Sequence, residues 1–244
     1  MRNHHTCEVW WASPRQAHPR LLDVLDGRER ERHARFHRRA DADRYLVGHA
    51  LLRGVCARRS GQRPGEICFE YHCPNCDHGG GHGKPYPSGP ARGLQVSLTH
   101  SGDRVGVAVL ADIEVGVDVE AVTSTRDLDR LAEHVLTEGE RIALDRVPTR
   151  QRERGFFTYW SRKEALLKAT GLGLSGGLRT IEVTAPDETA AVRSWQGPAA
   201  PTTVWLTDLS PGDQHCGALA LLAPGPVQVI EHDSTRSATI LDSV

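Results

Sequence analysis

Four ionisable side chains in the middle of the chain have types and spacing that could do chemistry. "GVDVE" carries Asp118 and Glu120 two residues apart, and "WSRKEALLKATG" carries Glu164 and Lys168 four residues apart. Residues two apart lie on one face of a strand, and residues four apart face the same way on a helix. Three carboxylates brought together form a hard oxygen site suited to Mg²⁺, which keeps waters and binds substrate phosphates. The pattern therefore predicts a magnesium site for a phosphate-bearing ligand.

Each pair also has a plain structural interpretation. An Asp-x-Glu pair occurs by accident on solvated strands, and Glu164 with Lys168 matches an ordinary i,i+4 helix pair worth about 0.2–0.5 kcal/mol. The helix setting favours chemistry, because its neighbours are largely apolar: Phe156, Phe157, Tyr159, Trp160, Ala165, Leu166 and Leu167. On the strand, we expect Val117 and Val119 to point into the core and the carboxylates to lie on the other face.

Lysine is rare in this chain. Lys84, Lys163 and Lys168 are the three lysines, and the other 27 of the 30 basic residues are arginine. A genome-level preference for arginine would replace any lysine that only needs to be positive. The remaining lysines are then enriched for tasks that need a compact ammonium able to give up a proton, which a guanidinium cannot do.

Composition excludes several classes of protein. With 244 residues, 39% of them hydrophobic, the chain can bury one generous core or two small ones. A net charge of -1 and a pI near 6.9 give no overall field for nucleic acid or an anionic membrane. The N-terminus shows no apolar signal segment, so we expect a cytoplasmic protein with no membrane or nucleic-acid partner and with reduced cysteines.

Periodicity predicts an α+β chain of two halves, residues 1–112 and 113–230, followed by a polar tail at 231–244. We expect helices over 21–59, 126–146 and 156–171, the second with a Thr137–Glu140 capping box and the third ended by Gly171. Strands are expected within 66–71, 94–110, 113–122, 178–183, 202–209 and 216–223. No internal repeat is evident from the sequence.

Five motifs in this order resemble a known family: "RFHRRADADRYLVGHALLR", "GKPY", "LTHSGD", "GVDVE" and "WSRKEALLKATGLGL". The chain resembles a 4′-phosphopantetheinyl transferase of the surfactin-synthetase-activating type over about residues 28–180. Such enzymes move phosphopantetheine from coenzyme A to a serine of an apo acyl or peptidyl carrier protein and release adenosine 3′,5′-bisphosphate. The resemblance implies a pseudo-dimer of two similar α+β halves with the active site at their interface. It also implies Mg²⁺ as cofactor and, for a chain of this length, a monomer that serves secondary metabolism, including polyketide and nonribosomal-peptide carriers.

The resemblance assigns residues by position. Asp118, Glu120 and Glu164 take the Mg²⁺-binding places, and water completes the shell because Val119 cannot ligate. Glu164 is also the general base, and Lys168 offsets charge on the α-phosphate or protonates the leaving group. Expected coenzyme A contacts are Arg32, Arg39, Arg44, Lys84, Pro85, Thr99, His100 and Lys163, with His100 at the 3′-phosphate. Glu29 departs from the family's lysine, so Arg28 or Arg30 is expected to substitute there.

One motif leaves a second function class open. Cys73, Cys76, His78 and His82 have the residue types of a structural zinc site, which would make the chain a zinc-binding module or pin a loop of the transferase. We expect instead reduced cysteines in a loop that coenzyme A orders, because the spacing is irregular and the loop is rich in glycine. A catalytically inactive carrier-binding protein is the remaining alternative, and the complete acidic set argues against it.

Overall fold

The chain folds into two compact units. The computed structural model describes residues 6–72, 83–123, 127–173, 177–197, 200–235 and 240–243. Unit 1 comprises residues 1–112 and 227–244, and unit 2 comprises residues 113–226. The C-terminal segment therefore belongs to unit 1, which corrects the expectation of a separate polar tail. The Cys73–His82 loop lies outside the described residues.

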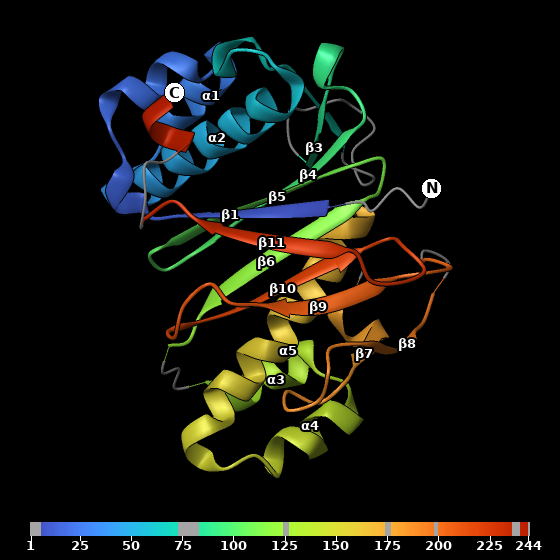
Figure 1. The fold of residues 1–244 in the computed structure, drawn as a ribbon. Coiled ribbons are helices and arrows are strands. Elements are labelled where there is room, and N and C mark those ends of the chain that lie inside the picture. The colour runs from blue at the N-terminus through green and yellow to red at the C-terminus, as the bar shows by residue number, and fades with distance from the viewer. Residues whose placement is uncertain are drawn as a thin grey trace. The chain divides into compact units, whose positions relative to one another are not determined.

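Unit 1 is a four-stranded sheet covered by one long helix (Figure 1). Its strands and helices are β1 Thr6–Ala12, α1 Gly27–Ala34, α2 Arg39–Ser60, β2 Phe69–His72, β3 Lys84–Pro87, β4 Leu94–Ser101, β5 Arg104–Ala111 and β11 Gln228–Asp233. The sheet order is β11-β1-β5-β4, with β11 parallel to β1 and the other pairs antiparallel. Apolar residues of α2, including Leu46, Ala50 and Val55, pack on Val105, Val107 and Val109 of β5.

Unit 2 is a three-stranded sheet covered by α5. Its strands and helices are β6 Val115–Ala121, α3 Leu128–Val135, α4 Glu138–Asp145, α5 Thr149–Thr170, β7 Ile181–Val183, β8 Val192–Trp195, β9 Trp205–Leu209 and β10 His215–Leu221. The sheet order is β6-β10-β9, and both pairs are antiparallel. Phe156, Ala165 and Ala169 of α5 share a core with Ala218 and Ala220 of β10.

The two units repeat one topology. In each, a first strand leads through short helices to a helix of 22 residues, then to two strands that pair with each other and to a second antiparallel pair. The order β1-β5-β4 in unit 1 corresponds to β6-β10-β9 in unit 2. Both long helices end at a glycine with positive φ, Gly61 at 71° and Gly171 at 74°, a conformation that favours glycine. The predicted α+β class and its two similar halves are confirmed.

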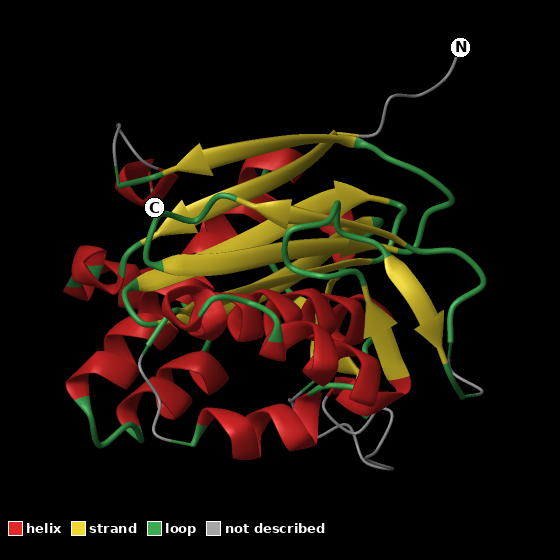
Figure 2. Cartoon of the chain, turned by 90° about the horizontal axis from the view of Figure 1, so that it is seen from below, coloured by secondary structure: helices red, strands yellow, loops and turns green. Residues whose placement is uncertain are grey.

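Two of the predicted segments each divide into two elements. The segment 94–110 forms a hairpin, β4 and β5, and the segment 126–146 forms α3 and α4, with the predicted Thr137–Glu140 capping box at the start of α4. Helices and strands both contribute to the units, as Figure 2 shows. Within the described residues, no helix is long and apolar enough to cross a membrane.

Candidate active site

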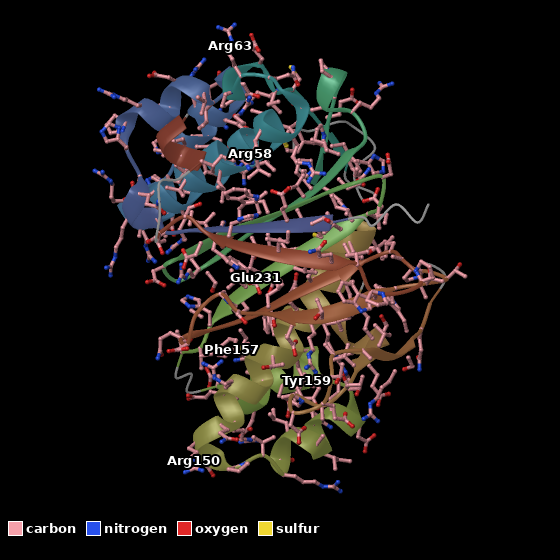
Figure 3. All side chains as sticks on the ribbon, in the orientation of Figure 1. Arg58, Arg63, Arg150, Phe157, Tyr159 and Glu231 are labelled. Atoms are coloured by element: carbon pink, nitrogen blue, oxygen red, sulfur yellow. The ribbon has the colours of Figure 1, made fainter. Side chains whose placement is uncertain are left out.

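Helix α5 carries two of the predicted site residues. It begins after Pro148 and runs for 22 residues, and a buried apolar stripe holds it in the core of unit 2. Phe157 and Tyr159, labelled in Figure 3, belong to this stripe. Glu164 and Lys168 lie one turn apart and are partly exposed, so their polar ends are accessible while the helix around them is fixed.

Strand β6 comes very close to α5 at Gly116. A Cβ atom on Gly116 would overlap the Ala165 carbonyl oxygen and the Ala169 amide nitrogen. A side chain here would push the two elements apart, so glycine is required for this packing. Because side chains two apart share a face of a strand, Asp118 and Glu120 lie on the same helix-covered face as Gly116.

The two faces of β6 are both buried at this point. Val117 and Val119 are fully buried, as expected, and lie on the strand face opposite Asp118. Asp118 is itself 3% exposed and pairs across the sheet with Ala218, which belongs to the core under α5. Both faces of β6 are therefore covered at this point, and the Asp118 carboxylate lies within the layer between strand and helix.

Asp118 and Lys168 form the central ion pair. The Lys168 ammonium donates a hydrogen bond to Asp118 Oδ1 at 2.7 Å. The Lys168 side chain is 28% exposed and that of Asp118 is 5% exposed, so the pair is shielded on the carboxylate side and accessible on the ammonium side. The Lys168 side chain therefore points at the acidic strand.

Glu164 is poised between its two charge states. Burial and the Asp118 charge together raise its pKa from 4.5 to about 7, and Lys168 opposes both effects. Among the described residues, Glu164 Oε1 is buried and has no hydrogen-bond partner. Such an oxygen is costly to leave unsatisfied, and a proton or a cation would satisfy it.

The carboxylates of Asp118 and Glu164 suit a magnesium ion. Within the part of the chain that the structure describes, no three Asp, Glu, His or Cys side chains gather closely enough to hold a metal ion. Glu120, two residues after Asp118 on β6, stays the predicted third ligand. Mg²⁺ is commonly bound by one or two carboxylates together with waters and substrate phosphates. The unsatisfied Oε1 of Glu164 and the hard oxygen donors suit that ion.

Comparison with known proteins identifies the family. Residues 114–220 match the family model of the 4′-phosphopantetheinyl transferase superfamily. The 4′-phosphopantetheinyl transferase HetI of Nostoc sp. is 32% identical over 209 residues, which cover 84% of this chain and 81% of the relative. The chain belongs to the 4′-phosphopantetheinyl transferase superfamily. The transferase psf-1 of Bacillus pumilus is also 32% identical, over 74% of this chain and 72% of that protein.

The family match falls on the site just described. Residues 114–220 lie wholly within unit 2 and include Asp118, Glu164 and Lys168. The holo-[acyl-carrier-protein] synthase of Thermotoga maritima is similar over 45% of this chain and 62% of that structure, with 27% identity and a TM-score of 0.36.

Lys163, expected to contact coenzyme A, lies in a buried environment within unit 2. Its side chain is fully buried, and its ammonium pairs with Glu140 Oε2 at 2.5 Å. It also donates to the carbonyl oxygens of Val135 at 2.8 Å and Leu178 at 3.1 Å. An ammonium has three N–H donors, and all three are taken, so no donor is left for a phosphate. The expected phosphate contact by Lys163 is therefore wrong.

The predicted arginines of unit 1 differ in how accessible they are. Arg32 is exposed and lies 6.0 Å from the centre of the Tyr45 ring. Arg39 is exposed and pairs with Asp43 at 3.0 Å, a contact worth little in water. Arg44 is more engaged, since it pairs with Asp41 and donates to the Gly102 carbonyl oxygen at 3.2 Å.

The remaining predicted contacts lie on β3 and β4. Lys84 is 9% exposed, with its ammonium 5.9 Å from the centre of the Tyr86 ring, and Pro85 follows it on the strand. Thr99 is buried, whereas His100, the next residue of β4, is exposed. Of these residues, His100 has the exposure that a phosphate contact requires.

Glu29 does not occupy a phosphate-binding position. It is 3% exposed, accepts from Arg53 at 2.7 Å and lies 3.0 Å from His49 Nδ1. It also completes the capping box at the start of α1. Its departure from the family's lysine is thus structural. Arg28 stays exposed, while Arg30 donates to the Leu25 carbonyl oxygen at 2.7 Å, which favours Arg28 as the substitute.

Two ion pairs that hold α5 in place were not predicted from the sequence, Glu140 with Lys163 and Asp208 with Arg162. Glu140 was recognised as a capping residue, but its role opposite Lys163 was not. Arg162 is fully buried and holds Asp208 of β9 through two hydrogen bonds of 2.8 and 2.7 Å. The adjacent charges at 162 and 163, between apolar residues of the second half of the helix, were the available signal that both were buried and paired.

Proposed function

We propose that this chain transfers the 4′-phosphopantetheine group from coenzyme A to a serine hydroxyl of an apo acyl or peptidyl carrier protein, as a transferase of the surfactin-synthetase-activating type. The observation that carries the proposal is Glu164 with a pKa raised to about 7, one helical turn from Lys168 and beside Asp118. The sequence identity to named 4′-phosphopantetheinyl transferases supports the reaction type.

Glu164 takes the role of general base. A carboxylate whose pKa lies near the working pH accepts a proton efficiently, and burial gives Glu164 that value. Its carboxylate receives the serine proton, directly or through a water. The serine oxygen then forms a bond to the β-phosphorus of coenzyme A, and the bond from that phosphorus to the bridging oxygen breaks.

Lys168 takes the role of the cation at the leaving group. Adenosine 3′,5′-bisphosphate leaves with negative charge on its α-phosphate, which an ammonium can offset or protonate. Asp118 orients this ammonium through the 2.7 Å hydrogen bond, and the Lys168 side chain stays accessible. A lysine suits this task because its proton can be transferred, whereas a guanidinium keeps its protons.

We further propose Mg²⁺ as the cofactor, which Asp118, Glu120 and Glu164 would hold together with waters and the pyrophosphate. When bound, it supplies charge neutralisation on the pyrophosphate oxygens. Its presence would also lower the pKa of Glu164, because a cation stabilises the charged carboxylate. In unit 1, exposed Arg28, Arg32 and His100 are proposed to bind phosphate groups of coenzyme A.

Release of adenosine 3′,5′-bisphosphate tests this proposal. The nucleotide should accumulate when the protein is mixed with coenzyme A, Mg²⁺ and an apo carrier. Its accumulation should stop when EDTA is added. Separate fatty-acid, polyketide and nonribosomal-peptide carriers would show which class is served, and we propose that the secondary-metabolism carriers are. Nucleotide release that is equal with and without a carrier would indicate hydrolysis of coenzyme A instead and would contradict the proposal.

A further inference from the structure

A buried cationic hub lies directly beside the proposed base. The Lys163 ammonium joins the end of α3 through Val135, the start of α4 through Glu140 and the 3₁₀ turn Leu178–Thr180 through Leu178. Glu140 extends the hub, since its Oε1 accepts from the Val183 amide of β7 at 2.9 Å. The Lys163 side chain therefore connects α5 to three other segments of unit 2, and Glu140 extends the network to β7.

The hub and the strand contact hold opposite sides of α5. Successive helix residues are rotated by about 100°, so Lys163 points away from the face that carries Ala165 and Ala169. That second face meets Gly116 of β6 at close range. Glu164 and Lys168 lie between the two faces. The rotation of α5 about its axis is thus fixed from both sides, and this rotation decides where their polar ends point.

We propose that Lys163 is a positioning residue, whose buried ammonium holds α5 in the rotation that directs Glu164 and Lys168 toward Asp118. This inference rests on the proposed function of Glu164 and Lys168. It assigns Lys163 no contact with coenzyme A, since its three N–H donors are used within unit 2.

The hub requires lysine for a geometric reason. Burial lowers the pKa of Lys163, and the Glu140 carboxylate opposes that change. Three acceptors surround one nitrogen, which matches the three donors of an ammonium. A guanidinium is planar and larger, so its donors would not reach the same three oxygens without moving the surrounding segments.

Steady-state kinetics of Lys163→Met separates positioning from phosphate binding. The matched control is Arg150→Met, which removes an exposed cation from the first turn of the same helix (Figure 3). We expect Lys163→Met to lower kcat by about tenfold or more, because small displacements of reacting groups reduce rates strongly. The KM for coenzyme A and the dissociation constant for coenzyme A measured by calorimetry should stay within about twofold. Arg150→Met should match the parent in all three.

A second variant keeps the test valid if Lys163→Met does not fold. Glu140→Gln retains the size of the side chain and leaves the two carbonyl contacts of Lys163, so we expect a folded protein with a smaller loss of kcat. Thermal melts confirm that each variant is folded at the assay temperature. An unchanged kcat in folded variants with a lowered Tm would show that the hub contributes to stability only. A raised KM with kcat retained would show that Lys163 contacts a phosphate after all. Either result overturns the inference while the parent stays active, whereas an inactive parent would contradict the proposed function itself.

Discussion

Replacement of Glu164 by glutamine should stabilise the metal-free protein, and only at high pH. In the folded chain the pKa of Glu164 is raised from 4.5 to about 7 by burial and by Asp118. Between these values the folded state binds more protons at this site than the unfolded state does. The free energy of unfolding therefore falls as pH rises from about 4.5 to about 7. Above pH 7 the charged carboxylate destabilises the folded chain, and below pH 4.5 this contribution disappears.

The expected size follows from the pKa difference. Each unit is worth about 1.4 kcal/mol, so the full difference gives at most about 3 kcal/mol. Because Glu164 is partly exposed, solvent screening reduces this to about 2 kcal/mol. Glutamine has nearly the same shape and no charge, so the variant should gain about 2 kcal/mol relative to the parent at pH 8 and little at pH 5.

Urea unfolding with EDTA at pH 5 and pH 8 measures this difference. The control Glu133→Gln removes an exposed glutamate of α3 and the same formal charge, so it should show no such pH dependence. The slope of unfolding against urea should be equal in all variants, which keeps the comparison valid. A Glu164→Gln protein that is equally or less stable than the parent at pH 8 would show that Glu164 is not held charged in a buried site, and the argument for it as a base would fail.

Three further predictions concern α5 and its contacts. Lys168→Arg should keep the charge beside Asp118 but lower the rate at least about tenfold in single-turnover assays, since a guanidinium cannot pass on a proton. Full activity would show that only the positive charge of Lys168 is needed. Gly116→Ala should lower the free energy of unfolding by about 1–3 kcal/mol in urea titrations, whereas Gly139→Ala, in helix α4 with 3.4 Å to its nearest neighbour, should not; equal effects would contradict the close contact of β6 with α5. Arg162→Met should lower Tm by several degrees, because Asp208 and nearby carbonyl oxygens lose a fully buried partner; an unchanged Tm would mean that this network contributes nothing.

Local signals in the sequence predicted the elements that carry the candidate site. The end of α5 at Gly171 and the Thr137–Glu140 capping box depend on a few adjacent residues, and both were confirmed. The pairing of Lys168 with Asp118, which joins a helix to a strand, was not predicted. What holds these elements to one another depends on tertiary contacts, which spacing along the chain does not reveal.

Lys163 and β11 show why the rest escaped prediction. Spacing places Lys163 next to Glu164 but does not say that α3, α4 and the turn at Leu178 cover that side of the helix. Strand β11, Gln228–Asp233, is polar because it lies at the edge of its sheet, so its sequence matches a solvated tail. The repeat of topology between the units leaves no periodic trace, since packing conserves the pattern of elements and not the side chains.

The mass of an apo carrier after incubation with this protein, coenzyme A and Mg²⁺ tests the central claim most directly. We predict that the intact carrier gains the mass of one phosphopantetheine group, that a carrier whose acceptor serine is alanine gains none, and that Glu164→Gln protein modifies the carrier far more slowly. A carrier that keeps its apo mass with the parent protein across all three carrier classes, while coenzyme A binds, would contradict the account.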